Sequence, residues 1–293
     1  MDHEIVADYR NHVGEGPTWD PRDKKLYWID IPNGRIFRYD PASGDHAQIF
    51  DGPMMGGFTM QEDGSLLLFM EKGAIAVLRD GKLDYVVDEL PGEDGNRFND
   101  VIADPAGRVF CGTMPVDDQR AMVGEHAGSL YRLDTDGTVS PLLREVGLPN
   151  GLGFTPDGKG MYFTDSTAYK IYLFDYDQAS GELSNRRIFV ETDPDRGVPD
   201  GMTVDADGYV WSARAMGGAV YRYTPDGKED MVVPFPTASI PSSVAFGGED
   251  LTEMYVTTIG GHMRDKVGPE AGALFRLRPG VNGRLEHFTR VGL

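Results

Sequence analysis

The sequence is poor in cysteine, in positive charge and in long apolar runs. Cys111 is the only cysteine among 293 residues, so neither an intrachain disulfide nor a cysteine-based zinc site can form, and a reducing, cytoplasmic location is expected. Lys and Arg number 28 against 47 Asp and Glu, and the resulting formal charge of −19 would repel nucleic-acid phosphates and anionic membrane surfaces. We therefore expect neither nucleic acid nor membrane as a partner. The negative charge is equally consistent with plain solubility and with attraction of a metal cation.

Signals for export, for membrane insertion and for several enzyme classes are also missing. The first residues, MDHEIVADYR, contain neither a basic leader nor an apolar signal segment, and the longest strongly apolar run, residues 66–70, is far too short to span a bilayer. The sequence has no GxSxG, no GxxxxGK[ST] and no HExxH motif. These absences exclude a serine hydrolase with a nucleophile elbow, a P-loop enzyme and a zincin.

Internal repeats are present in place of those motifs. Six segments set Asp, Gly or Pro ahead of β-branched and aromatic residues, the pattern of a turn followed by a strand. They read DPRDKKLYWID, QEDGSLLLFM, DPAGRVFCGTM, TPDGKGMYFTDS, DADGYVWSARA and GGEDLTEMYVTT. Each is followed by an alternating second strand, such as GRIFRYD or GALFRLRPG. Units of about 40 to 55 residues with four short strands each predict an all-β, six-bladed β-propeller.

The repeats run through the whole sequence without a linker. We therefore expect one propeller domain over residues 1–293. Residues 4–9 are expected to supply the outermost strand of the last blade, beside the strands that follow Gly272, so that no sheet edge is left exposed.

One position of the repeat is polar in most units. Counting back eight residues from each turn gives Glu15, Gly56, Asn99, Asn150, Asp200 and Ser242. Equivalent positions at the start of the innermost strands of a propeller surround one end of the central channel, so these side chains are expected to converge there.

Four of these residues could bind a cation through oxygen. Glu15 and Asp200 offer carboxylates, and Asn150 and Asn99 offer amide oxygens, a hard-oxygen set suited to Ca²⁺, Mg²⁺ or Mn²⁺ and only weakly selective for Zn²⁺. Asn-Gly and Asp-Gly pairs also form hairpin corners, so each pair alone could be a turn. Glu15, however, is a poor turn former, and neighbouring buried carboxylates repel unless a cation lies between them. The pattern predicts a metal site at the central channel.

Several longer motifs resemble the SMP30/gluconolactonase family, which includes regucalcin-like proteins. The motifs run through nearly all of the chain, so the resemblance covers the fold and the site together. They are GEGPTWD, RFNDVIADPAGRVFCGTM, LPNGLGFTPDGKGMYFTDS, FDYD, VPDGMTVDADGYVW and EMYVTT.

The resemblance implies a six-bladed propeller with one catalytic divalent metal ion, acting as a hydrolase on the lactones of sugar acids. By motif position the metal ligands would be Glu15, Asn150 and Asp200. Arg97 and Asn99, in RFND, would contact substrate hydroxyls or the water on the metal.

One segment departs from the pattern of the family. After GTM some relatives carry an acidic pair, roughly AEE, whereas this chain carries PVDD. Asp117 falls on the position of the substrate-contacting Glu and is one methylene shorter. We therefore expect specificity to differ in the loop 115–127, which reaches past His126.

The chemistry of lactone opening explains why such residues are needed. A divalent metal polarises the carbonyl, stabilises the developing oxyanion and lowers the pKa of bound water. Asp200 is the expected general base, which takes a proton from water and returns one to the leaving alkoxide. Arg97 would orient the substrate by hydrogen bonds to ring oxygens and hydroxyls, although a salt bridge to Glu93, Asp94 or Asp100 is the alternative.

Three functions are consistent with these residues. A metal-dependent sugar lactonase is favoured by the motifs, with a small sugar lactone as substrate and the protein as a monomer or weak homodimer. A noncatalytic calcium-binding or scaffold propeller is the second, and Arg97 beside Asn99 argues against it because a structural ion needs no guanidinium. An organophosphate or aryl ester hydrolase is the third, expected only as a side activity because polar contacts suit polyols better.

Overall fold

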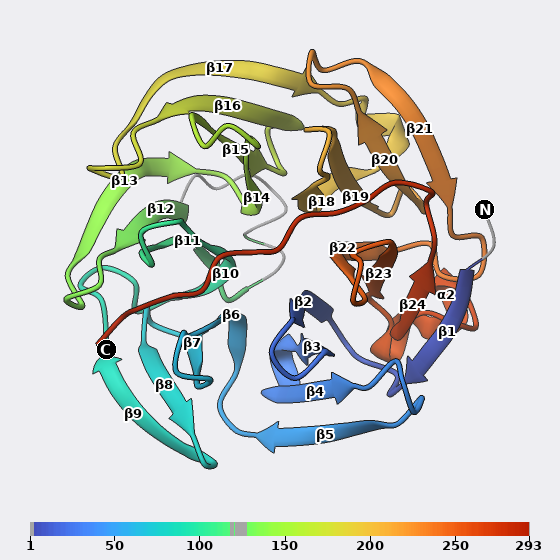
Figure 1. Ribbon diagram of the computed structural model, residues 1–293, viewed down its shortest axis with the longest axis horizontal. Coiled ribbons are helices and arrows are strands. Elements are labelled where there is room, and N and C mark those ends of the chain that lie inside the picture. Colours follow the sequence, from blue (N-terminus) through green and yellow to red (C-terminus); the bar gives the residue numbers. More distant parts are fainter. Residues whose placement is uncertain (1–2, 118–119, 121–127, 293) are drawn as a thin grey trace. The chain divides into compact units, whose positions relative to one another are not determined.

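Six four-stranded sheets make up the computed structural model, which describes residues 3–117, 120 and 128–292 (Figure 1). They confirm the expected all-β, six-bladed propeller. The chain divides by its contacts into two compact units, one of Met1–Pro53 and Phe189–Leu285 and the other of Met54–Ile188 and Glu286–Leu293. Each unit contains three of the sheets, and the two are described separately here as the first and the second unit. The single domain over residues 1–293 stays a prediction.

The first unit holds three antiparallel sheets and four short helical segments. Across the sheets the strands are β2 (Gly14–Asp20), β3 (Lys25–Asp30), β4 (Arg35–Tyr39) and β5 (His46–Asp51); β18 (Val198–Val204), β19 (Val210–Ala215), β20 (Ala219–Tyr223) and β21 (Glu229–Pro234); and β22 (Pro241–Gly247), β23 (Glu253–Thr258), β24 (Ala273–Leu277) and β1 (His3–Asp8). The helical segments are η1 (Ile31–Asn33), η2 (Pro194–Arg196), η3 (Gly261–Met263) and α2 (Arg264–Val267). Among the described residues, no helix has the length and apolar character needed to cross a bilayer.

The first strand of the chain completes the last sheet. β1 pairs with β24, with His3 opposite Leu277 and Asp8 opposite Ala273, and it lies at the outer edge of that sheet (Figure 1). The expected pairing of the N-terminal strand is therefore confirmed.

The second unit holds the other three sheets, except for residues 189–191 at the end of the last strand, which belong to the first unit by their contacts. Their strands are β6 (Met55–Met60), β7 (Leu66–Met70), β8 (Ile75–Arg79) and β9 (Lys82–Val87); β10 (Asn96–Ala103), β11 (Val109–Pro115), β12 (Gly128–Leu133) and β13 (Val139–Val146); and β14 (Pro149–Phe154), β15 (Gly160–Asp165), β16 (Lys170–Tyr176) and β17 (Leu183–Glu191). The first strands of neighbouring sheets contact one another, β6 with β10 and β10 with β14, as β18 does with β22 and β22 with β2 in the first unit.

The turns between first and second strands are closed by aspartate side chains. Between β18 and β19, Asp205 Oδ1 accepts hydrogen bonds from the backbone N–H groups of Asp207 at 3.1 Å and Tyr209 at 2.9 Å. Gly208 in this turn has a φ of 85°, which a residue with a Cβ adopts only with strain. These turns explain why the Asp-Gly repeats mark the starts of strands.

Apolar side chains fill the space between neighbouring sheets of each unit. Trp211 and Phe246 pack together in the first unit, and Phe110 and Phe154 do so in the second. Complete burial of such a side chain contributes about 1.5 to 3 kcal/mol to stability. Cys111 lies in another of these layers, where burial raises the pKa of its thiol. The prediction that Cys111 is a small buried hydrophobic residue is confirmed.

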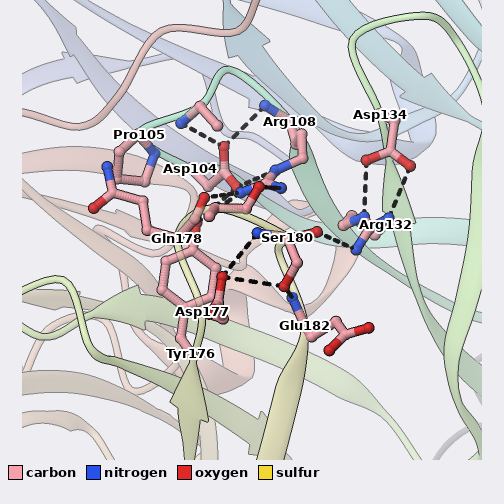
Figure 2. A network of polar contacts seen from close by, with 12 residues as sticks. Asp104, Pro105, Arg108, Arg132, Asp134, Tyr176, Asp177, Gln178, Ser180 and Glu182 are labelled. Carbon is pink, nitrogen blue, oxygen red and sulfur yellow. Dashed lines mark hydrogen bonds and ion pairs between the residues drawn. The ribbon is translucent and has the colours of Figure 1, made fainter.

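A buried ion pair joins two sheets of the second unit (Figure 2). Asp104 has no exposed surface, and its Oδ2 accepts hydrogen bonds from Arg108 Nε at 2.6 Å and from Tyr176 Oη at 2.8 Å. Arg108 Nη2 also donates to the carbonyl oxygen of Gln178 at 2.7 Å. The turn after β10 is thereby fastened to the turn after β16.

Substitution Asp104→Asn tests the importance of this ion pair. It leaves the guanidinium of Arg108 buried without a counter-charge, so we expect the free energy of unfolding to fall by about 3 kcal/mol in urea titrations. The control is Asp175→Asn, because Asp175 pairs with Arg187 at 2.7 Å in an exposed position. That control should lose less than about 1 kcal/mol. Equal losses in the two variants would contradict the special role of Asp104.

Candidate functional site

A β-bulge interrupts the first strand of every sheet at or beside the repeated polar position. A bulge inserts one extra residue into a strand, bends it and changes the direction of a side chain. In the first unit the pairing register shifts between Glu15 and Thr18, Pro199 and Met202, and Pro241 and Ser243. In the second unit it shifts between Met55 and Gly57, Phe98 and Val101, and Asn150 and Leu152.

The bulges decide between the two interpretations of the Asn-Gly and Asp-Gly pairs. Asn150 and Gly151 lie within β14, and Asp200 and Gly201 lie within β18, so neither pair forms a hairpin corner. The turn alternative is wrong for both pairs. Each repeated residue sits instead at a point where the strand is deformed, which is typical of residues next to active sites.

Glu15 and Asp200 are the two carboxylates that the first unit contributes. Their side chains are buried, with 5% and 8% of the residue surface exposed. Glu15 Oε2 accepts a hydrogen bond from the backbone N–H of Gly16 at 3.0 Å, and the φ of 57° at Gly16 makes this local bond possible. This bond ties the Glu15 carboxylate to the backbone of the bulge.

Arg97, Asn99 and the start of β14 meet in the second unit. Arg97 Nη1 donates to Asn99 Oδ1 at 2.8 Å and to the carbonyl oxygen of Phe98 at 2.9 Å. Asn99 Nδ2 donates to the carbonyl oxygen of Pro149 at 2.9 Å, directly before Asn150. The structure therefore brings Arg97 and Asn99 together with the peptide group that leads into Asn150.

Asn150 has an unsatisfied oxygen. Its Nδ2 donates to Ser166 Oγ at 3.1 Å, whereas its Oδ1 is buried and has no hydrogen-bond partner in the described structure. A buried acceptor without a partner costs about 1 to 3 kcal/mol. An amide oxygen of this kind is a ligand that hard cations such as Ca²⁺ accept, so Asn150 fits the role of a metal ligand.

Gly56 is the repeated position without an oxygen, and the reason is steric. A Cβ atom at Gly56 would lie 1.8 Å from the carbonyl oxygen of Phe98, because β6 and β10 approach closely there. A side chain at this position would push away the strand that carries Arg97 and Asn99.

The variant Gly56→Ala should therefore be strongly destabilised. We expect a loss of more than about 3 kcal/mol in the free energy of unfolding, the upper range for overpacking, because backbone rather than a flexible side chain must move. Gly95→Ala is the matched control, since a Cβ there would meet no atom within 4 Å. Urea denaturation of both variants gives the comparison, and a stable Gly56→Ala protein would show that β10 can shift.

Glu93 anchors the start of β10, a role that sequence reasoning missed. The sequence suggests Glu93 only as an ion-pair partner of Arg97. In the structure its buried carboxylate accepts hydrogen bonds from Asn96 Nδ2 at 2.7 Å and from Tyr131 Oη at 2.5 Å. The loop before the RFND motif is thus tied to β12, and no local signal in the sequence identifies Tyr131 as the partner.

Asp100 is a second carboxylate whose properties the sequence did not reveal. It follows Asn99 in the bulge of β10 and is half-buried. Burial raises the pKa of its carboxyl to about 7, against the opposing influence of the Arg97 guanidinium. The sequence shows that Asp100 belongs to the RFND motif, but the burial of its carboxyl depends on how the strands fold.

This raised pKa predicts an unusual pH dependence of stability in the metal-free protein. The unfolded carboxyl titrates near pH 3.9 and the folded one near 7, so the folded state binds more protons in between and the free energy of unfolding falls as pH rises through that window. Asp100→Asn removes the carboxyl and with it this fall in the free energy of unfolding. At pH 8 it should stabilise the protein by up to about 4 kcal/mol, at about 1.4 kcal/mol per pKa unit, with little effect at pH 4.

Urea titrations in the presence of a chelator, at pH 4, 6 and 8, measure this effect. Asp157→Asn is a control of opposite sign, because hydrogen bonding to Thr155 lowers the pKa of Asp157. It should not stabilise the protein at pH 8. A difference between wild type and Asp100→Asn that does not change with pH would refute the assignment.

Asp117 lies at the start of the loop expected to set specificity. It is exposed, two residues after the end of β11, and its Oδ1 accepts a hydrogen bond from the backbone N–H of Arg120 at 3.4 Å. Most of the loop that follows, including His126, lies outside the described residues. Its substrate contact stays a prediction.

The metal site itself is not apparent as a cluster of acidic or basic ligands. Within residues 3–117, 120 and 128–292, no group of three or more His, Cys, Asp or Glu side chains could hold a metal ion. The ligand set expected from the sequence has two carboxylates and one amide, so it falls outside such a group by composition.

The chain is similar to proteins of known families over nearly all its length. Residues 13–260 match the model of the SMP-30/gluconolactonase/LRE-like region. The pentonolactonase XacC of Haloferax volcanii is 46% identical over 98% of both chains, and the regucalcin of Oryctolagus cuniculus is 35% identical over 96% of this chain and 95% of its own.

A solved structure agrees with these relatives. The calcium-binding protein regucalcin of Agrobacterium tumefaciens superimposes with a TM-score of 0.89 at 28% identity, covering 99% of this chain and 98% of its own. The similarity therefore extends over the complete set of sheets.

Proposed function

The chain belongs to the SMP-30/gluconolactonase/LRE-like family and is a lactonase, and from this premise we propose that it hydrolyses the lactone of a five-carbon sugar acid with one divalent metal ion. The substrate class is supported by the 46% identity to a protein named pentonolactonase. The main support for a metal ion is the Oδ1 of Asn150, which is buried and has no hydrogen-bond partner in the described structure.

Glu15, Asn150 and Asp200 are the proposed ligands of this ion. All three are buried and lie at or beside bulges in first strands, and all match the ligand positions of the family motifs. A set of carboxylate and amide oxygens favours Ca²⁺, Mg²⁺ or Mn²⁺ over Zn²⁺. The calcium-binding regucalcin with the same fold supports Ca²⁺ as the first ion to test.

Hydrolysis requires a water molecule to add to the lactone carbonyl carbon and the ring C–O bond to break. When bound, a divalent ion supplies Lewis-acid polarisation of the carbonyl and stabilises negative charge on its oxygen. Asp200 accepts the proton of the attacking water and returns it to the ring oxygen as that oxygen leaves. The product is a hydroxy acid, which ionises at neutral pH and releases one proton.

Arg97 and Asn99 are the proposed contacts to substrate hydroxyls. Their mutual hydrogen bond of 2.8 Å fixes one relative to the other, so their donors are presented in a fixed arrangement. Preorganised donors of this kind position a polyol with little loss of freedom on binding. Asp117 is proposed as a further contact, with reach reduced by one methylene relative to Glu.

Proton release measured with a pH indicator tests this function. Protein stripped with a chelator should hydrolyse xylono-, arabinono- and gluconolactone no faster than the spontaneous reaction, and Ca²⁺, Mg²⁺, Mn²⁺ or Zn²⁺ added singly should restore turnover. A pentonolactone should give the highest kcat/KM. Asp200→Asn should lower kcat by at least about 100-fold, the usual contribution of a general base.

Asp207→Asn is the matched control, an exposed aspartate seven residues further along in the same sheet, and it should retain full activity. Glu15→Gln and Asn150→Ala should weaken metal binding. Full activity in chelator would overturn the metal requirement. Turnover restricted to aryl esters would overturn the substrate class.

A further inference from the structure

Ser242 occupies the repeated polar position of the β22 sheet but points at backbone. The residue is fully buried, and its Oγ donates a hydrogen bond to the carbonyl oxygen of Gly14 at 2.5 Å. Gly14 is bonded directly to Glu15, and both Ser242 and Gly14 belong to the first unit. The peptide group that leads into Glu15 is therefore held by a side chain of the neighbouring sheet.

A second hydroxyl sets the direction of this contact. Thr257 Oγ1 lies 3.0 Å from Ser242 Oγ and is also buried. The carbonyl oxygen of Gly14 can only accept, so the Ser242 proton is used there and the Thr257 hydroxyl is the donor to Ser242 at 3.0 Å. The carbonyl oxygen of Ser243, at 3.4 Å, is a more distant competing acceptor for the same proton. The chain of donors runs from Thr257 through Ser242 to Gly14, and successive hydrogen bonds in a buried chain strengthen one another.

The second unit contains the same relation in another chemical form. Asn99 Nδ2 donates to the carbonyl oxygen of Pro149, directly before Asn150. In both units, the side chain at one repeated position holds the carbonyl group before the next repeated position. In both, the residue that follows the held carbonyl is a proposed metal ligand.

We propose that Ser242 is a positioning residue for Glu15, which together with Thr257 fixes the Gly14–Glu15 peptide so that the carboxylate is presented to the divalent ion. The inference rests on the proposed function, because it takes Glu15 to be a ligand. A peptide group is planar, so a hydrogen bond to its oxygen restricts the orientations of the plane from which the Glu15 backbone continues. The bond from Gly16 to Glu15 Oε2 then sets the carboxylate itself.

Loss of the Ser242 hydroxyl should weaken metal binding more than it weakens the fold. Removal of groups that orient metal ligands typically reduces affinity about 10- to 100-fold. For Ser242→Ala we expect about a 10-fold rise in Kd. Thr257→Val keeps the volume and removes only the donor to Ser242, so a smaller rise of about 2- to 5-fold is expected.

Isothermal titration of the metal-stripped full-length protein with Ca²⁺ alone, and separately with Zn²⁺ alone, measures these constants. Thr59→Val is the hydroxyl control, because Thr59 Oγ1 donates to Thr289 Oγ1 at 3.3 Å in a buried chain that ends at the carbonyl oxygen of Met60. That carbonyl precedes no proposed ligand, so the loss of this hydroxyl should leave Kd unchanged. Val233→Ala is the stability control, since it removes buried side-chain volume from β21 and should lower stability without changing Kd.

Activity provides a second readout that a purely structural role would not produce. At saturating metal, Ser242→Ala should regain nearly the wild-type kcat, because occupancy of the site is restored, whereas Asp200→Asn should stay inactive. A kcat that stays low at every metal concentration would overturn the positioning role.

The outcomes separate this inference from the proposed function. Wild-type binding together with an unchanged Kd in Ser242→Ala would overturn the role of Ser242 and leave the metal site standing. Failure of the wild type to bind either ion would overturn the metal site and, with it, this inference. If Ser242→Ala does not fold, Thr257→Val decides, and an unchanged Kd in that variant overturns the proposal.

Discussion

The close approach of first strands from neighbouring sheets is the constraint on which the candidate site depends. Each first strand carries one extra residue near its start, so its backbone bends where it faces the next sheet. Within each unit a backbone carbonyl is thereby brought against the repeated position of its neighbour, as Phe98 is against Gly56 and Pro149 is against Asn99. Such buried carbonyl groups need a hydrogen-bond donor. A repeated residue that supplies this donor uses its side chain on the backbone, and one that does not supply it keeps its side chain for other contacts.

Some of the repeated residues donate a hydrogen bond to the backbone of a neighbouring strand, and others directly follow a carbonyl group that accepts such a bond. The side chains of Asn99 and Ser242 each donate a hydrogen bond to the carbonyl oxygen of the residue before the next repeated position. Glu15 and Asn150 are the residues that directly follow these carbonyl groups. Gly56 offers no donor because no side chain fits there, and Arg97 supplies the hydrogen bond to Phe98 instead. A row of polar residues at one repeat position is therefore not a row of equivalent ligands.

The sequence was sufficient to predict the sheets, the pairing of the N-terminal strand and the place of the repeated residues in the first strands. Turns rich in Asp, Gly and Pro and the alternating strands that follow them are local signals, and they occur in every sheet. The sequence could not separate a bulge from a hairpin corner at Asn150 and Asp200, because Asn-Gly and Asp-Gly favour both and only long-range pairing distinguishes them. The burial of Asp100 and the contact of Glu93 with Tyr131 depend on the fold in the same way.

Polar side chains are organised differently in the middle of β10 and after its end. After its end, Asp104 is buried against Arg108, and the matching Asp205 of the first unit is buried against Arg222, with oxygen and nitrogen 2.6 Å apart in both pairs. In its middle, at the bulge, the strand carries the amide of Asn99 and the carboxyl of Asp100. The buried ion pair and the apolar layers order the strands on either side of these residues through contacts within the protein. The proposed divalent ion would therefore meet oxygens on strands that are already ordered, unlike the ion of a domain that folds only around its metal.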